Sequence, residues 1–510
     1  MLRSSRKKLA IASLPAVAVL GLAACAPVLQ AEQTPPQNRI ASHSEAKAVR
    51  QPNILFVLVD DLGARDLGYE GARLNESPNI DAFARSSAQF DAAYSPSPVC
   101  SPSRAAILTG KDPARLGITT WIPGGEYQNM PMVEPQIPAH LPLAEVTIAE
   151  VLKNAGYRTF FAGKWHLGGQ GFLPSDQGFD VNLGGGEYGQ PPNGYYAPYK
   201  NEYLSDGPKG EYLENRLTDE TIKFMESAKD GGKPFFAFLS FYAVHTPIQA
   251  SPDGSLDYFK RKAAALAQND EPLERQEGIG RTKLIQDNPV YASMVHAMDG
   301  NFGRVLATLD RLDLRKDTIV VFTSDNGGLS TLDPEISLYE KGTPTSNEPL
   351  RAGKGWTYEG GIRVPLLIGG PGIGHRTFEA PVVLTDLFST LLDLAGVAQP
   401  VAGDGTSLKS LIDGHTLPSE RTMFWHYPHY HGSGSKPASA IRRGEWKLVR
   451  NYEADRWELY DLRSDPGEKH DLSAQEPRRL ETMKQDYWRM VAATGAKLPT
   501  RRDGISEGNR

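Results

Sequence analysis

The chain has 510 residues, with 55 lysines and arginines against 61 aspartates and glutamates and a formal net charge of −6 at pH 7. This balance lacks the basic excess of a nucleic-acid-binding protein, so we expect no nucleic-acid partner. The length is too great for one small domain and suits a large α/β domain with a smaller companion.

The N-terminus predicts export. A basic segment is followed by an apolar run from Leu9 to Ala24, which is typical of a signal peptide over residues 1–24 and not of a membrane span. The run ends in Leu-Ala-Ala-Cys25, which resembles a bacterial lipobox whose cysteine becomes the lipidated first residue of the mature protein. An ordinary cleaved secretory signal is the alternative. We expect an exported bacterial lipoprotein, periplasmic or at the cell surface, that Cys25 anchors to a membrane.

Three further segments follow from composition. Residues 25–51 are rich in Ala, Gln, Pro and Ser without an apolar period, which predicts a flexible tether. The main domain is expected over residues 52–420. From 421 to 510 the pattern predicts a smaller α+β subdomain, with paired antiparallel strands at 440–449 and 457–461 and a terminal helix at 477–493.

Strands and helices alternate through the main domain. Apolar runs predict buried strands at residues 53–59, 159–162, 235–240 and 318–322. This alternation favours an α/β fold with a large, doubly wound, mostly parallel sheet flanked by helices. Polar motifs follow these four strands closely, at Asp60-Asp61, Lys164-Trp-His166, His245-Thr-Pro and Asp325-Asn326. Because ligands bind beyond the carboxyl ends of parallel strands, we expect the motifs to form one site.

The first of these motifs indicates a cation site. Asp60 and Asp61 are adjacent carboxylates at a strand end, and they repel each other unless a cation or hydrogen-bond donors compensate. A solvated turn is the alternative.

Cys100 lies at the start of a predicted helix. Ser101 and Pro102 have the form of an N-cap and a first-turn proline, and the run from Arg104 ends at Gly110. A helix N-terminus presents unpaired N–H groups and the positive end of the helix dipole, which suit an anion. A small buried cysteine is the structural alternative. If Cys25 is lipidated, Cys100 has no disulfide partner within the monomer.

These motifs, in this order, resemble the type I sulfatases, in which the cysteine of C-x-P-x-R is oxidised to formylglycine. The resemblance rests on Cys100-Ser-Pro-Ser-Arg104 with Leu108-Thr-Gly110, on the four strand-end motifs, and on Gly353-Lys354-Gly-Trp-Thr-Tyr-Glu-Gly-Gly-Ile-Arg-Val-Pro365. It spans about residues 51 to 470. It implies an alkaline-phosphatase-like fold, a sulfuric ester hydrolase, and a formylglycine-generating or anaerobic maturase enzyme as partner.

The resemblance also implies roles for single residues. A hydrated aldehyde at position 100 would attack sulfur with one hydroxyl, and the second hydroxyl would later expel sulfate. Arg104 and Lys164 would hold the formylglycine oxygens, and His166 would be the base in the release step. His245 and Lys354 would bind the bridging side of the sulfate and protonate the leaving alcohol.

The implied metal site uses oxygen ligands. Asp60, Asp61, Asp325 and Asn326, with oxygens from residue 100 and from the sulfate, would make a roughly six-coordinate site. Because the set contains neither thiolate nor imidazole, we expect one Ca²⁺ and not Zn²⁺.

The substrate is less defined by the sequence. The segment His426-Tyr-Pro-His429-Tyr-His431 matches no common metal-ligand spacing, so we interpret it as an aromatic and imidazole rim that contacts sugar. A structural strand edge is the alternative. His140, Arg351 and Trp356 are weaker rim candidates. With surface anchoring, the pattern resembles sulfatases that act on sulfated polysaccharides or their oligosaccharide fragments.

Two other functions remain open. The first is a phosphate or phosphonate monoester hydrolase of the same superfamily. Dimetal phosphatases of that group generally carry Asp-His where this chain has Asp325-Asn326, and Ser or Thr where it has Cys100, which favours sulfate. The second is a glycan-binding surface lipoprotein whose Cys100 is never oxidised.

Overall fold

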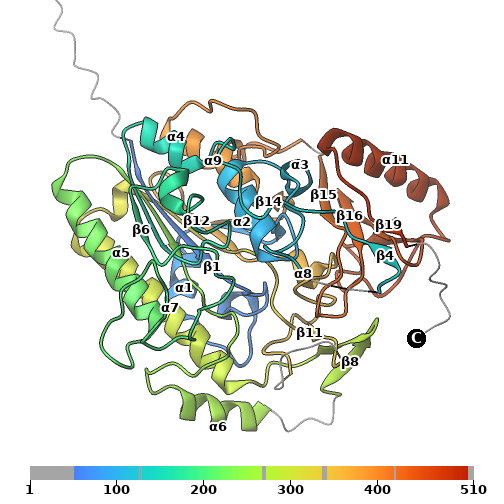
Figure 1. Cartoon of the computed structure of the whole chain (residues 1–510), viewed down its shortest axis with the longest axis horizontal. Helices are drawn as coiled ribbons and strands as arrows, with labels where there is room; N and C mark the ends of the chain where they lie inside the picture. The colour runs from blue at the N-terminus through green and yellow to red at the C-terminus, as the bar shows by residue number, and fades with distance from the viewer. Residues whose placement is uncertain are drawn as a thin grey trace, which may run out of the picture. The chain divides into compact units, whose positions relative to one another are not determined.

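The apolar strands form a central sheet, which we describe from a computed structural model (Figure 1). The structure describes residues 51–502 except 126, 128, 267–271, 336–341 and 419–420. The sheet has eight strands, in the spatial order β13 (Arg376–Phe378), β2 (Ala88–Phe90), β12 (Leu366–Gly369), β10 (Thr318–Ser324), β1 (Asn53–Val59), β7 (Phe235–Ser240), β5 (Arg158–Gly163) and β6 (Val181–Leu183).

The strands from β10 to β6 are parallel to one another, whereas β12 runs antiparallel to both neighbours. Helices cover both faces. Because side chains alternate along a strand, Leu55, Val57 and Val59 of β1 pack on one face, with α1 (Pro78–Ala84), α5 (Leu213–Asp230) and α7 (Pro289–Arg311). On the other face, β1 packs with α2 (Cys100–Thr109), α4 (Ile148–Asn154) and α9 (Asp386–Ala395). The predicted doubly wound, mostly parallel sheet is confirmed.

Smaller elements surround the sheet. The segment after residue 250 contains α6 (Leu256–Leu266) and the hairpin of β8 (Glu274–Glu277) and β9 (Gly280–Lys283), which pairs with β11 (Thr331–Leu332). Two-stranded pairs join β3 (Ala93–Tyr94) to β14 (Val382–Val383) and β4 (Met132–Val133) to β19 (Thr500–Arg501). The short helices are α3 (Pro113–Leu116), α8 (Glu359–Ile362) and α10 (Lys409–Ile412), with 3-10 turns at Gly68–Glu70, Pro174–Gln177 and Arg315–Asp317.

The C-terminal part is an antiparallel sheet with a helix on one face. Its order is β15 (Thr422–Tyr427), β16 (Ala438–Arg443), β17 (Trp446–Asn451) and β18 (Arg456–Asp461). The expected single strand at 440–449 is wrong: it is β16 and β17, which turn at Gly444 with φ +59°. Ile441, Leu448 and Leu459 pack on α11 (Pro477–Thr494), and the opposite face packs on the main domain.

From Gln51 onward the chain forms one compact unit. No helix among the described residues combines the length and the apolarity that a bilayer crossing needs. The predicted signal peptide and Cys25 lie outside the described residues, as does the expected domain boundary at residue 420. These stay predictions from sequence.

Candidate active site

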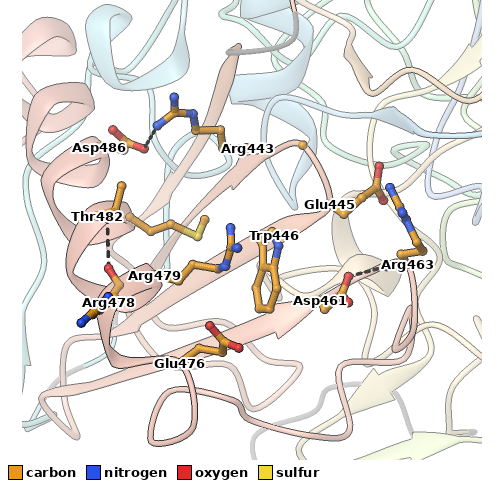
Figure 2. Close-up of a pocket in the computed structure, with 12 residues that line it drawn as sticks. Arg443, Glu445, Trp446, Asp461, Arg463, Glu476, Arg478, Arg479, Thr482 and Asp486 are labelled. Carbon is orange, nitrogen blue, oxygen red and sulfur yellow. Dashed lines mark hydrogen bonds and ion pairs between the residues drawn. The ribbon is translucent and has the colours of Figure 1, made fainter.

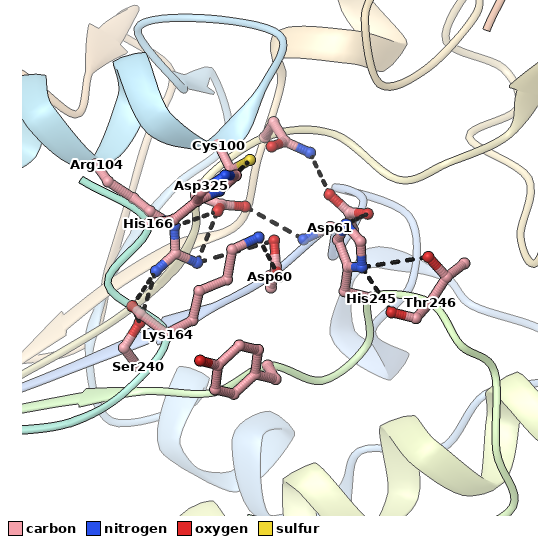
Figure 3. A network of polar contacts seen from close by, with 12 residues as sticks. Asp60, Asp61, Cys100, Arg104, Lys164, His166, Ser240, His245, Thr246 and Asp325 are labelled. Atoms are coloured by element: carbon pink, nitrogen blue, oxygen red, sulfur yellow. Dashed lines mark hydrogen bonds and ion pairs between the residues drawn. The ribbon is translucent and has the colours of Figure 1, made fainter. Parts of the chain in front are cut away.

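Four parallel strands bring the predicted motifs to one edge of the sheet (Figure 3). In register, Val59 of β1 lies beside Ser324 of β10, and Gly163 of β5 lies beside Ser240 of β7. The residues that follow these strand ends therefore meet. The Asp61 N–H lies 3.2 Å from Asp325 Oδ1, the Lys164 Nζ lies 2.6 Å from Asp60 Oδ2, and the His245 Nε2 lies 3.7 Å from Asp61 Oδ2.

Cys100 is the first residue of α2, as expected for a helix N-terminus, but the predicted N-cap at Ser101 is wrong. Val99 is the N-cap, and the Ser101 hydroxyl bonds elsewhere: it donates to the His166 carbonyl at 2.9 Å and accepts from the Ile122 N–H at 3.0 Å. The helix ends at Gly110 in the left-handed conformation, as predicted. Ser101 thus ties the start of α2 to two loops of the site.

The Cys100 thiol faces His166. Its Sγ lies 3.2 Å from Nδ1, and the His166 Nε2 lies 2.6 Å from the Ile122 carbonyl. Because a carbonyl only accepts, Nε2 carries the proton and Nδ1 is the acceptor. Burial, and then the nearby Lys164 ammonium, hold the pKa of His166 well below its ordinary value, so the ring is neutral. The backbone of His166 has φ +59°, a strained conformation of the kind found at functional sites.

Arg104 points inward from α2 and clamps Asp325. Its Nε and Nη2 lie 2.8 and 2.7 Å from Asp325 Oδ2, while Nη1 donates to the Lys164 carbonyl and to the Ser240 hydroxyl. Burial disfavours the guanidinium, but Asp325 and Asp60 act together with the other nearby groups to raise the pKa of Arg104 above its ordinary value. Arg104 therefore fixes the ends of β10, β5 and β7 relative to α2.

Each acidic group of the cluster has a buried cation beside it. Lys164 pairs with Asp60 at 2.6 Å, and Lys354 pairs with Asp61 at 2.7 Å. Burial raises the pKa of Asp60 despite Lys164. Burial would also raise the pKa of Asp61, but Lys354 and His245 hold it below its ordinary value. With Arg104 beside Asp325, the three buried cations and the three carboxylates of the cluster therefore pair one to one.

The donor set fits a hard cation. Asp60 Oδ1 and Asn326 Oδ1 are buried and have no hydrogen-bond partner among the described residues, although the Asn326 amide donates to Asp61 Oδ1 at 2.8 Å. Carboxylate and amide oxygens without donors are the ligands that Ca²⁺ prefers. Ligand atoms of Asp60, Asp61 and His245 also lie within 4.8 Å of one another, which adds an imidazole that the sequence did not indicate as a ligand.

Several supporting residues were not anticipated. The Ser240 hydroxyl bridges Arg104 and the Lys164 carbonyl, and only its place at a strand end could have indicated it. Glu214 of α5 is buried and accepts a hydrogen bond from the Ala243 N–H, two residues before His245. Asp66 accepts from the Gly63 N–H and the Tyr291 hydroxyl, which fixes the turn after Asp61. Glu214 and Asp66 belong to no local motif.

The three histidines of the predicted rim lie in different surroundings in the structure. His426 is buried in the C-terminal subdomain, with Nδ1 on the Ser439 hydroxyl and Nε2 on the Lys497 carbonyl, which is the strand-edge alternative. His429 is buried with Nε2 2.8 Å from Thr119 Oγ1. His431 packs beside Gly355, where burial and Lys354 lower its pKa to about 3.

The weaker rim candidates have other partners. Arg351 is held by Glu277 at 2.7 Å and stacks over Tyr358. The Trp356 indole donates to the Ser433 carbonyl. His140 stacks on Phe172 beside Gly168, two residues after His166. His431, Trp356 and His140 thus lie near the motif residues, whereas Arg351 holds the β8 strand.

A parallel sheet that gathers carboxylates, lysines and a helix-start residue at one edge defines a hydrolase site for an anionic ester. The chain belongs to the sulfatase family, whose profile matches residues 52–397, and it is a sulfuric ester hydrolase. A second profile, N-sulphoglucosamine sulphohydrolase, C-terminal, matches residues 352–492.

Similar proteins include enzymes of known name. The chain is 34% identical over 406 residues to N-acetylgalactosamine-6-sulfatase of Homo sapiens, covering 74% of this chain and 69% of that protein. It is 31% identical over 494 residues to arylsulfatase A of Homo sapiens, covering 86% and 87%. The crystal structure of Ps i-CgsB has a TM-score of 0.69 at 29% identity, covering 86% of this chain and 93% of that one. A second structure of Ps i-CgsB, with a TM-score of 0.68 at 28% identity and the same coverage, contains k-i-k-neocarrahexaose.

Proposed function

We propose that this protein removes sulfate from a sulfated carbohydrate, with Cys100 oxidised to formylglycine and one Ca²⁺ bound beside it. The observation that carries the proposal is the position of Cys100, the first residue of α2, next to neutral His166 and the cluster of Asp60, Lys164 and Arg104. A maturase enzyme would supply the oxidation.

Asp60, Asp61, Asp325 and Asn326 would hold the Ca²⁺, with residue 100 as a further ligand. When bound, the ion would supply positive charge that favours ionised oxygens on residue 100 and on the sulfate. The unpartnered oxygens of Asp60 and Asn326 support this assignment.

The side chains around position 100 suit proton handling. The His166 Nδ1 is an acceptor that faces residue 100, so it can take a proton from a hydroxyl there. Arg104 and Lys164 would hold oxygens of residue 100. His245 lies beside Asp61 across the cluster from Arg104 (Figure 3), and Lys354 pairs with Asp61 at 2.7 Å. There the two residues would bind the sulfate and protonate the leaving alcohol.

The names of similar proteins indicate which substrates should be tested first. One acts on N-acetylgalactosamine 6-sulfate by its name, and another binds a neocarrahexaose. Sulfated galactosaminoglycan and carrageenan oligosaccharides are therefore the proposed class. His431, Trp356 and His140 are the residues we propose to contact sugar.

We further propose that the protein is an exported lipoprotein anchored through Cys25. This proposal rests on the N-terminal sequence alone. Replacement of Cys25 by alanine should abolish incorporation of labelled palmitate in the bacterial host while leaving the protein exported.

Mass analysis of the tryptic peptide from Ser86 to Arg104, purified from the native host, tests the site. We expect an aldehyde at position 100, and hydrolysis of an aryl sulfate that is lost in Cys100→Ala. An unmodified thiol would favour a glycan-binding lipoprotein and contradict the proposal. Faster turnover of the matched aryl phosphate or phosphonate would instead favour the phosphoesterase alternative.

A further inference from the structure

A cavity on the C-terminal subdomain lies outside the active site (Figure 2). It has a volume of about 800 Å³ and lies between the β16–β17 turn, the end of β18 and the start of α11. Its lining includes Trp446, Arg463, Arg478, Arg479, Asp461 and Glu476.

The cavity opens on the face of the subdomain that is turned away from the active site. Successive side chains of β17 point to opposite faces of the sheet. Lys447 reaches Glu359 of α8 at 3.0 Å on the main-domain side, so Trp446 lies on the α11 side. A ligand in the cavity would therefore not contact Cys100.

The cavity has more available positive charge than negative charge. Among the described residues, the guanidinium groups of Arg463, Arg478 and Arg479 are exposed and pair with no carboxylate. By contrast, the lining residue Asp486 is already neutralised by Arg443 and Arg489.

Another lining acid, Glu445, lies 3.4 Å from Arg442. Of the acidic residues that line the cavity, Asp461 and Glu476 have no arginine side chain paired with them in the described part of the chain, compared with three guanidinium groups that pair with no carboxylate there. Planar guanidinium groups bind oxyanions in a bidentate manner.

The start of α11 adds to this preference. Arg478 and Arg479 lie in the first turn of an 18-residue helix that has no acidic residue in that turn and no side-chain cap. Cations there are disfavoured by the helix dipole, and the first N–H groups lack partners within the helix. An anion bound at this end would offset the positive charge there and accept hydrogen bonds from the first N–H groups.

Trp446 supplies an apolar surface beside the charges. Its ring is partly buried, and the Arg479 guanidinium lies 4.1 Å from the ring centre. An indole that is partly covered by a cation can pack on the C–H face of a sugar while the arginines hold its anionic groups.

We propose that this cavity is a second binding site for the sulfated polysaccharide chain, separate from the site that removes sulfate. The proposal rests on the proposed function for its choice of ligand. Arg463, Arg478 and Arg479 bind sulfate groups of the chain, and Trp446 packs on a sugar ring between them.

The test compares Arg463→Gln/Arg478→Gln/Arg479→Gln with a control of equal charge change elsewhere on the surface, Arg85→Gln/Lys209→Gln/Arg261→Gln. Both are made in the full-length protein. Binding to chondroitin sulfate and to carrageenan polymers is measured by affinity electrophoresis, and hydrolysis of a small aryl sulfate is measured in parallel. We expect the cavity variant to bind at least one polymer about tenfold more weakly, because three exposed charge pairs act together. The control should bind like the wild type, and both should hydrolyse the aryl sulfate at the wild-type rate.

Trp446→Ala is a second variant for the polymer-binding measurement, because Trp446 is proposed to pack on a sugar ring. Its thermal midpoint is measured to verify that it folds. Equal polymer binding by the cavity variant and the wild type would overturn the proposal, as would an equal loss in the control. If the wild type hydrolyses aryl sulfate but binds neither polymer, the second site is wrong and the proposed function survives. If it binds polymer through these arginines but hydrolyses no sulfate ester, the proposed function is wrong and the second site survives.

Discussion

At the scale of single residues, the active site is a set of buried charges that neutralise one another. Arg104 contributes most to this arrangement, because its guanidinium contacts Asp325 through two nitrogens and the Lys164 carbonyl and Ser240 hydroxyl through a third. A lysine could carry the charge at this position but could not make these four contacts together.

Arg104→Lys should therefore lower kcat for an aryl sulfate at least about 100-fold and the free energy of unfolding by about 2 kcal/mol. Steady-state kinetics and urea unfolding measure the two effects. The control is Arg115→Lys, which replaces the half-exposed arginine that contacts Asp404 through two nitrogens. It should change stability by less than about 1 kcal/mol. Equal effects of both substitutions would contradict the proposed role of Arg104.

Asn326 gives a residue-scale test of the cation site. Its Oδ1 is buried and accepts no hydrogen bond from any residue that the structure describes, so Asn326→Ala should remove a metal ligand. Saturating Ca²⁺ should stabilise the wild type by about 3 kcal/mol at 100 times Kd, and the variant by much less. Thermal unfolding with Ca²⁺ and with chelator measures this difference. Asn301→Ala is the control, since Asn301 is also buried but bonds Asn215 and the Ala297 carbonyl, and it should keep the full Ca²⁺ increment.

At the scale of elements, the C-terminal sheet supports the segment that carries Lys354. Glu359 at the start of α8 receives hydrogen bonds from Tyr94 and from Lys447 of β17, and its N–H donates to Glu468. The Gly361 carbonyl of α8 accepts from the Gly327 N–H, next to Asn326. The subdomain thus reaches the active site through α8.

Lys447→Met should destabilise the protein by about 3 to 5 kcal/mol, because it removes the buried cation that the carboxyl groups of Glu359 and Glu468 share. Lys436→Met is the control, because the partly exposed Lys436 pairs with Glu453, and it should cost about 1 kcal/mol or less. Urea unfolding distinguishes them. A small effect of Lys447→Met would show that α8 does not depend on the subdomain.

The elements also show what the sequence could predict. Buried strands and the polar residues that follow them are local patterns, and β1 with Asp60 or β10 with Asp325 lie where those patterns indicate. The N-cap of α2 was misplaced because the Ser101 hydroxyl bonds to loops distant in sequence. The sequence placed His426 in a rim that contacts sugar, but in the structure its ring is bonded by Ser439 of β16 and by the Lys497 carbonyl, which are distant in sequence. Support such as Glu214 depends on tertiary contacts that no local pattern contains.

At the scale of the whole molecule, the two faces of the C-terminal sheet make different contacts. One face joins α8 and the active site through Lys447, and the other carries the arginine cavity beside Trp446. A polysaccharide held at the second face would keep its sulfates close to the enzyme, which raises their effective concentration at the active site.

Joining the two parts through buried carboxyl groups makes stability depend on pH. Burial raises the pKa of Glu468 from 4.5 to about 7, although Lys447 opposes this. In the unfolded chain the group ionises near its ordinary value, whereas in the folded protein it keeps its proton up to about pH 7. The folded state therefore binds more protons between these values, and stability falls as pH rises through this window.

For Glu468 alone the loss between pH 4.5 and 8 is at most about 3 kcal/mol. Glu468→Gln mimics the protonated form, so its free energy of unfolding should fall less steeply with pH, and the variant should gain on the wild type toward pH 8. Urea unfolding from pH 5 to 8 measures both slopes. Glu481→Gln, on the exposed surface of α11, should retain the wild-type slope. If Glu468→Gln also retains it, the buried carboxyl group is already ionised at pH 5 and the subdomain contact is an ion triad throughout.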